Sequence, residues 1–106
     1  MTVLRLDPEG WEAFVRSGPA LAGFWAPWSL PSQGLEPLLA AVAADFAGRL
    51  RVGLADHDAS PDLAERYRIQ GLPTLILFKG GAEVQRRVGL MDRAAVHAML
   101  REALGG

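Results

Sequence analysis

Two serines, Ser29 and Ser32, are the first positions in this 106-residue sequence that could do chemistry. A serine attacks a substrate only when a base takes its proton and hydrogen-bond donors stabilise the resulting oxyanion. Neither His57 nor His97 stands in a recognisable motif with the two serines. A serine at the start of a helix instead accepts an orphan backbone N–H bond, which stabilises the helix by about 1 kcal/mol. The pattern therefore favours helix capping by Ser29 and Ser32 over nucleophilic catalysis.

The run Asp56-His57-Asp58 contains side-chain types that bind metal ions. Consecutive residues at the end of a strand point in alternating directions, so these three cannot easily converge on one ion. The sequence has no cysteine, which excludes thiol, disulfide and iron–sulfur chemistry, and its two histidines make an all-protein zinc site unexpected. We expect no metal, no bound cofactor, and a solvated loop at residues 56–58.

Charge and hydropathy exclude other function classes. The 11 basic and 12 acidic residues are interspersed and give a net charge of −1, so no basic stripe marks a nucleic-acid-binding protein. No apolar run approaches the length of about 20 residues that spans a membrane. The N-terminus lacks a charged start followed by a long apolar run, so a cytoplasmic protein is expected. The length suits a single domain over residues 1–106.

Short apolar segments alternate with segments of helical periodicity. Strands are predicted at residues 2–6, 20–26, 50–55, 74–78 and 83–88, and helices at 8–17, 32–47, 61–67 and 93–104. Asp7, Ser60 and Asp92 are expected to cap three of these helices, and Pro37 to kink another. The order βαβαβαββα predicts an α/β protein with parallel pairing first and an antiparallel hairpin, turning at residues 79–81, last.

Two motifs at a fixed separation carry a family resemblance. Phe24-Trp25-Ala26-Pro27-Trp28, followed by Ser29-Leu30-Pro31-Ser32 and Pro37, resembles the active-site strand, turn and kinked helix of thioredoxins. Residues 71–81 (GLPTLILFKGG) resemble that family's cis-proline segment and final hairpin, and Val88-Gly89 resembles the glycine after the hairpin. The resemblance covers the chain from residue 20 onward. It implies the thioredoxin fold, a central mixed five-stranded sheet flanked by four helices.

The departures from the family's pattern concern its chemistry. Thioredoxins carry WCGPC in the turn, and both cysteine positions are serine here, Ser29 and Ser32. Only a thiolate attacks a disulfide, and a serine hydroxyl stays protonated near neutral pH. The resemblance also places the family's buried carboxylate at Gly23 and its buried lysine at Leu54. The family's activity is protein-disulfide oxidoreduction, but no disulfide reductase activity is expected of this chain.

The resemblance implies that a peptide-binding groove remains. In thioredoxins the equivalents of Trp28 and of the cis-proline, Pro73 here, border a groove for an extended peptide. The backbone of the residue before that proline, Leu72 here, pairs with the peptide as a small strand addition. Leu90 and Met91 would form another wall. The expected groove residues are Trp28, Leu30, Pro31, Leu72, Pro73, Leu90 and Met91.

Three functions fit these observations. The first is a non-catalytic, thioredoxin-like protein that binds a protein or an extended peptide, as a chaperone-like protein or a subunit. The second is a thiol–disulfide oxidoreductase whose cysteines were changed to serine by engineering, which explains the serines but not Gly23 or Leu54. The third is a homo-oligomer or scaffold that associates through an apolar active-site face. That face would comprise Pro27, Trp28, Leu30, Leu72 and Leu90.

Overall fold

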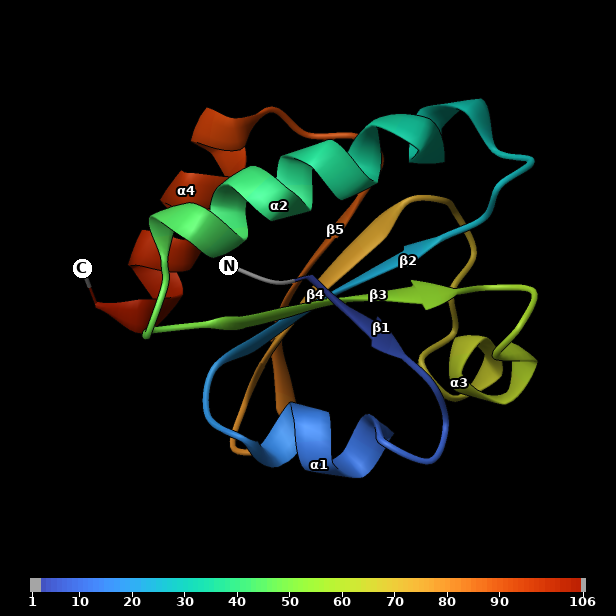
Figure 1. Cartoon of the computed structure of the whole chain (residues 1–106), viewed down its shortest axis with the longest axis horizontal. Coiled ribbons are helices and arrows are strands. Elements are labelled where there is room, and N and C mark those ends of the chain that lie inside the picture. Colours follow the sequence, from blue (N-terminus) through green and yellow to red (C-terminus); the bar gives the residue numbers. More distant parts are fainter. Residues whose placement is uncertain (1–2, 106) are drawn as a thin grey trace.

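The computed structural model describes residues 3–105, which form a five-stranded sheet with helices on both faces. The strands are β1 (Val3–Leu6), β2 (Ala20–Trp25), β3 (Arg51–Asp56), β4 (Thr74–Lys79) and β5 (Ala82–Val88). The α-helices are α1 (Trp11–Arg16), α2 (Leu35–Asp45), α3 (Pro61–Arg66) and α4 (Arg93–Leu104), with a 3₁₀ helix, η1 (Leu30–Gly34), directly before α2. Figure 1 shows α2 and α4 on one face of the sheet and α1 and α3 on the other. The predicted α/β architecture is confirmed.

The sheet is mixed and has the strand order β1-β3-β2-β4-β5. β3 pairs in parallel with β1 and with β2, as the alternation of strands and helices predicts. β4 pairs antiparallel with β2 and with β5. Gly80 and Gly81 turn the hairpin with φ angles of 63° and 86°, a conformation that a side chain disfavours. Because Phe24 near the end of β2 lies opposite Thr74 at the start of β4, residues 26–32 and 70–73 extend from the same end of the sheet.

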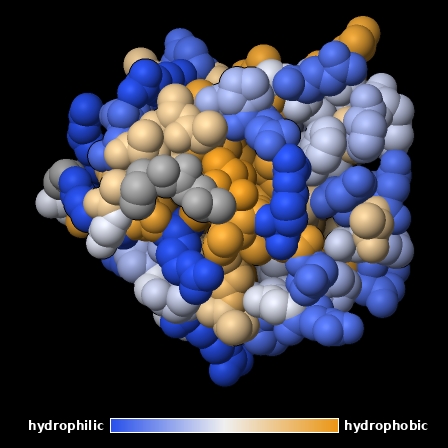
Figure 2. Space-filling model, in the orientation of Figure 1, coloured by the Kyte–Doolittle hydropathy of each residue, from blue (hydrophilic) through white to orange (hydrophobic). Residues whose placement is uncertain are grey.

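Each face of the sheet has its own hydrophobic core. Leu21 and Leu77 pack under α2 and α4, whereas Phe24 and Phe78 pack against Trp11 of α1. β2 and β4 are buried on both faces, which agrees with their uninterrupted apolar sequences. Apolar residues also reach the surface along the sheet edge that β1 forms, where hydrophilic side chains surround them (Figure 2).

Two helices begin differently from the prediction. Gly10 occupies the N-cap of α1 and Trp11 is its first residue. Asp7 therefore does not cap the helix, because its Oδ1 accepts the Gly10 N–H at 2.7 Å and closes a turn before it. α2 begins at Leu35, so Pro37 lies in the first turn, where its missing N–H breaks no α-helical bond. The expected interior kink is replaced by a change from the 3₁₀ geometry of η1 to α-helix at Leu35.

The other two helices differ in how they are capped. Asp92 caps α4 as predicted, since its Oδ1 accepts the Ala95 N–H at 2.8 Å. α3 begins at Pro61 as predicted, but the side chain of Ser60 makes no capping hydrogen bond.

Candidate functional site

Ser29 and Ser32 lie in the segment that joins β2 to α2, and neither acts as a helix cap. Ser29 precedes η1 but its side chain makes no capping bond. A capping side chain bonds the second or third N–H of a helix. The second residue of η1 is Pro31, which has no N–H. The N–H of the third residue, Ser32, donates to the Ser29 backbone carbonyl at 3.1 Å and is not free for a capping side chain. Ser32 lies within η1, and its buried Oγ has no hydrogen-bond partner among residues 3–105. The prediction of capping by both serines is wrong.

Beneath η1 and α2, Gly23 of β2 lies opposite Leu54 of β3 in the sheet. A Cβ atom at Gly23 would lie 2.8 Å from Leu39 Cδ1 and 2.9 Å from Leu35 Cδ2. These distances are shorter than normal carbon contacts, so a side chain fits only if the leucines move. The three atoms nearest to such a Cβ are all leucine side-chain carbons, which cannot partner a buried carboxylate.

The run Asp56-His57-Asp58 holds the indole ring of Trp28. Trp28 Nε1 donates to Asp58 Oδ2 at 2.7 Å, and His57 Nδ1 lies 3.5 Å from Asp58 Oδ1. Asp56 Oδ1 accepts the Asp58 N–H at 2.9 Å and so stabilises the turn that carries both neighbours. The indole is fixed at its nitrogen, yet the Trp28 side chain remains 66% exposed.

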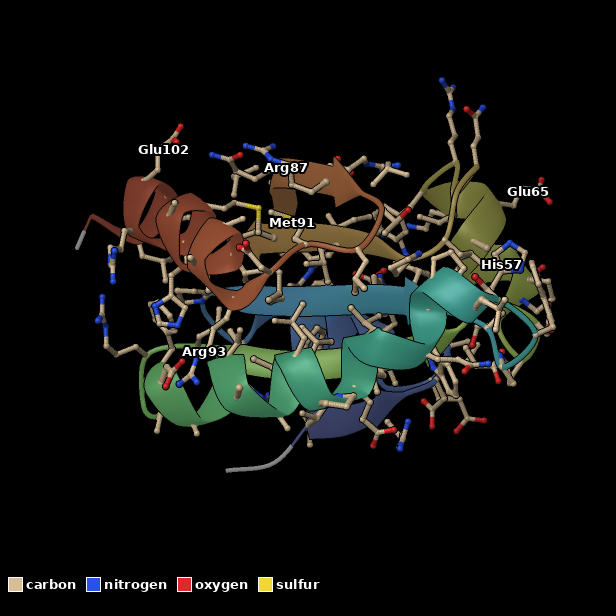
Figure 3. All side chains as sticks on the ribbon, turned by 90° about the horizontal axis from the view of Figure 1, so that it is seen from above. His57, Glu65, Arg87, Met91, Arg93 and Glu102 are labelled. Carbon is tan, nitrogen blue, oxygen red and sulfur yellow. The ribbon has the colours of Figure 1, made fainter. Side chains whose placement is uncertain are left out.

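Three chain segments meet at a hollow beside Trp28. The hollow has a volume of about 380 Å³ and is lined by Trp28, Ser29, His57, Ile69, Gln70 and Leu72. Figure 3 shows His57 at the end of the molecule where the loop between β3 and α3 lies. The lining combines apolar surface with the hydroxyl of Ser29, the imidazole of His57 and the amide of Gln70. No acidic side chain is among these six residues.

The loop before β4 presents open backbone groups. The Leu72–Pro73 peptide bond is cis, and the ring of Pro73 is buried, so Leu72 and not Pro73 reaches the surface. On one side Thr74 Oγ1 donates to the Gly71 carbonyl at 2.6 Å, and on the other the Gly89 N–H donates to the Pro73 carbonyl at 2.8 Å. Within residues 3–105, the N–H and C=O of Leu72 itself have no hydrogen-bond partner. The loop is held on both sides of Leu72, whose own N–H and C=O have no partner within these residues.

The opposite wall is apolar. A Cβ at Gly34 would lie 3.4 Å from Leu90 Cδ2, which places Leu90 beside the end of η1. Leu30 and Leu90 are 76% and 54% exposed, and Pro31 is also exposed. Met91 is half-buried and packs against the core under α2 and α4. We call the surface formed by Trp28, Leu30, Pro31, Leu72 and Leu90 the Trp28 face.

A second polar cluster lies away from the Trp28 face, at the far end of α2. Arg93 of α4 donates through Nε to Asp45 Oδ2 at 2.7 Å, and His97 Nε2 lies 2.7 Å from the same oxygen. The hydrogen bond from Arg93, followed by that from His97, lowers the pKa of Asp45 from 3.8 to about 2. This cluster joins α4 to α2 and has a structural role.

Two kinds of site are not found in the part of the chain that the structure describes. Within it, no group of three or more His, Cys, Asp or Glu side chains could hold a metal ion. Within the same residues, no helix is long and apolar enough to cross a membrane.

These features define a class of protein. It has a mixed five-stranded sheet with helices on both faces, and an exposed tryptophan beside a proline loop where the central strand β2 ends. The model of the thioredoxin family matches residues 2–102. The chain therefore belongs to the thioredoxin family.

Individual relatives are thioredoxins from bacteria and from plant chloroplasts. The chain is 39% identical to the thioredoxin of Acidithiobacillus ferridurans over 88 residues, which are 83% of this chain and 82% of that protein. It is 32% identical to the thioredoxin of Staphylococcus aureus strain Mu50 over 104 residues, which are 98% of this chain and 100% of that protein. It is 30% identical to the chloroplastic M-type thioredoxin of Zea mays over 105 residues, 97% of this chain. The chain spans only 63% of that maize protein and 54% of the chloroplastic thioredoxin M4 of Arabidopsis thaliana.

This chain has no cysteine. Thiol–disulfide exchange proceeds by attack of a thiolate on a disulfide sulfur, so the serine hydroxyls at positions 29 and 32 cannot carry it out. The side chains at this end of the sheet can still pack against a ligand and exchange hydrogen bonds with it.

The sequence did not reveal the part that residues 56–58 take in this site. The contact between Trp28 and Asp58 joins residues 30 positions apart, and no local pattern marks it. In the parallel pair of β2 and β3, Trp25 lies opposite Asp56, so both strands end at the same place. His57, the next residue after β3, therefore lies beside the residues that follow β2 and lines the hollow.

Proposed function

We propose that this chain is a non-catalytic thioredoxin-family protein that binds an extended segment of a partner protein on the Trp28 face. The segment lies against Trp28 and Leu90 and pairs with the backbone of Leu72 as a short added strand. Such a protein holds or docks its partner, as a chaperone-like protein or as a subunit of an assembly. The proposed location is the cytoplasm.

The observation that carries this proposal is that the N–H and the C=O of Leu72 have no hydrogen-bond partner among residues 3–105 and lie between exposed apolar side chains. An added strand pairs with backbone N–H and C=O groups that have no other partner, so the open groups of Leu72 suit an incoming strand. Trp28, Leu30 and Leu90 supply three of the five large apolar side chains that the described residues expose. Apolar side chains gathered at one end of a molecule mark an interaction surface.

A capture experiment with matched variants tests the proposal. The wild-type chain, a Leu30→Glu/Leu90→Glu variant and a Val84→Glu control are immobilised and exposed to a lysate of the cells that make the protein. Val84 is a suitable control because it is 47% exposed and lies on β5, outside the Trp28 face. Retained proteins should be lost from the double variant and kept by the control. Equal retention by all three would refute the proposal.

A homo-oligomer through the same face is a second candidate, favoured by Leu30, which is 76% exposed. Glutamate at this position would place charge in the interface between two copies. Light scattering of the wild-type chain and of Leu30→Glu distinguishes the candidates. A dimer mass that falls to the monomer mass in the variant would support self-association, and a monomer mass in both would exclude it.

An engineered oxidoreductase is a third candidate, favoured by the hydroxyl of Ser32, which has no hydrogen-bond partner among residues 3–105. A buried thiol tolerates apolar surroundings better than a hydroxyl does, so the position suits cysteine. Replacement of the two cysteines by engineering does not explain why leucine side chains fill the space beside Gly23. Cysteine codons at positions 29 and 32 of the natural gene would establish it, and serine codons would exclude it.

A further inference from the structure

A second hollow lies at the end of the sheet opposite to the Trp28 face. It has a volume of about 390 Å³, and its lining includes Arg49 and Arg51, so we call it the Arg51 hollow. Figure 1 shows the connection from α2 to β3 at this end, whereas the segment that carries Trp28 follows the other end of β2. The apolar lining residues are Leu4, Pro19, Ala43, Ala47, Leu50 and Val52.

The charge of the Arg51 hollow has a single sign. No acidic side chain is among the ten residues that line it, and both of its charged residues are arginines. A guanidinium only donates hydrogen bonds and stays protonated in proteins, so each arginine is a permanent cationic donor. Asp45, the acidic residue nearest to Arg49 in the sequence, is already bonded by Arg93.

Aromatic rings hold both guanidinium groups. Arg51 Cζ lies 5.7 Å from the centroid of the Phe14 ring, and Arg49 Cζ lies 5.4 Å from the centroid of the Phe46 ring. A contact with a ring face restricts the side chain but uses none of its N–H donors for a hydrogen bond. Within residues 3–105, the side chain of Arg51 makes no hydrogen bond and no ion pair. Its donors are therefore held in place without a partner.

Two further polar groups line the Arg51 hollow. The hydroxyl of Ser17 donates to the Phe14 carbonyl at 2.7 Å, so its proton is already used. The backbone N–H of Gly48 has no hydrogen-bond partner among residues 3–105. The donors without a partner on this lining thus include the guanidinium of Arg51 and the N–H of Gly48, and an anion is the ligand that suits both.

We propose that the Arg51 hollow binds a small amphipathic anion, an apolar chain or ring that ends in a carboxylate or a phosphate. The apolar residues pack against the body of the ligand, and Arg51 and the Gly48 N–H donate to its oxyanion. A volume of about 390 Å³ is within the range of small-molecule sites. The site is separate from the Trp28 face and does not depend on the proposed function.

The test is a set of ¹H–¹⁵N chemical-shift titrations of the wild-type chain at neutral pH. Octanoate and octyl phosphate should cause saturable shifts at the amides of residues 17–18 and 47–52. Octylammonium has the same apolar body with the opposite charge, and acetate has the carboxylate without the body. Both should bind there at least about tenfold more weakly. Binding of either octyl anion supports the proposal, and the tighter of the two identifies the preferred head group.

Two pairs of variants assign the binding to the hollow. Arg51→Gln should weaken octanoate binding about tenfold, because a charge-assisted hydrogen bond is lost, whereas Arg87→Gln, at an exposed position on β5, should bind as the wild type does. Ala47→Leu adds side-chain volume to the lining and should also weaken binding. Ala44→Leu, on α2 but outside the lining, should not. An amide spectrum that matches the wild type outside residues 17–18 and 47–52 shows that a variant is folded.

Three results would overturn the proposal. The first is equal affinity for octanoate and octylammonium, which would mean that the arginines do not select charge. The second is equal octanoate affinity in folded Arg51→Gln and Arg87→Gln. The third is that millimolar octanoate and octyl phosphate cause no saturable shifts at residues 17–18 and 47–52.

Discussion

Replacing Ser32 should stabilise the protein. Its Oγ is buried within η1 and has no hydrogen-bond partner among residues 3–105. A buried hydroxyl without a partner costs about 1–3 kcal/mol, and alanine is also the better helix former by a few tenths of a kcal/mol. Loss of packing around the removed oxygen offsets part of this gain. We expect Ser32→Ala to raise the free energy of unfolding by about 1–2 kcal/mol, and Ser32→Cys to do so by a similar amount.

Urea unfolding followed by tryptophan fluorescence measures this change. The midpoint should move to higher urea while the slope m stays constant, because the surface exposed on unfolding is the same. Thermal unfolding should show a midpoint higher by about 4–8 °C for each kcal/mol. Ser29→Ala is the matched control, since Ser29 is 7% exposed and its side chain makes no capping bond. Its effect should stay within about 0.5 kcal/mol.

A loss of 1 kcal/mol or more in Ser32→Ala would show that the Ser32 hydroxyl stabilises the fold. It would mean that the hydroxyl has a partner, such as a buried water, that stabilises η1. An equal gain in Ser29→Ala would also contradict the prediction, because the gain would then not depend on the buried Oγ of Ser32.

Three further predictions concern stability. Gly23→Asp should lower the free energy of unfolding by several kcal/mol, because its Cβ would meet the leucines of α2 and its carboxylate would be buried; an unchanged urea midpoint would contradict this. Arg68 has a φ of 53°, a left-handed conformation that costs a residue with a side chain about 1 kcal/mol. Arg68→Gly should therefore raise the midpoint of thermal unfolding, and a lower midpoint would show that Arg68 is not strained. Folding lowers the pKa of Asp45 from 3.8 to about 2, so its stabilising effect is complete above the unfolded value and is lost as the pH falls toward 2. Asp45→Asn should therefore be less stable than wild type at neutral pH and converge with it in acid, and a constant difference across pH would count against the assignment.

The fold was predictable from the sequence because local signals agree with one another. Apolar runs at Ala20–Trp25 and Thr74–Lys79 are the central strands, and the Gly80-Gly81 turn sets the hairpin that follows. Asp92 lies directly before α4 and caps it. In each case the residues that determine the structure are neighbours in the chain.

The errors arose where a nearby residue changed the outcome of a local rule. Ser29 has the right type and position to cap a helix, but Pro31 and the Ser29 carbonyl leave no N–H to accept. Asp7 closes a turn that ends before α1 begins. Helix-capping rules count residue types, whereas the result depends on which N–H groups are still unpaired.

The site depends on contacts between distant segments, and these were only partly predictable. The resemblance to thioredoxins indicated Trp28, Leu72 and Leu90, and the structure brings their segments to one end of the sheet. It did not indicate His57, because strand pairing between β2 and β3 positions that side chain. Nor did it indicate that Pro73 is buried beneath the face.

Binding of an extended segment to the Trp28 face requires no dithiol chemistry. The most direct test is a ¹H–¹⁵N chemical-shift titration of the wild-type chain with the peptide Ser-Thr-Val-Lys-Val-Thr at pH 8. We expect saturable shifts that are largest at the indole N–H of Trp28 and at the backbone amides of residues 70–72 and 90–91. Saturable shifts confined to α1, β1 or the far end of α2, or no shifts at millimolar peptide, would contradict it.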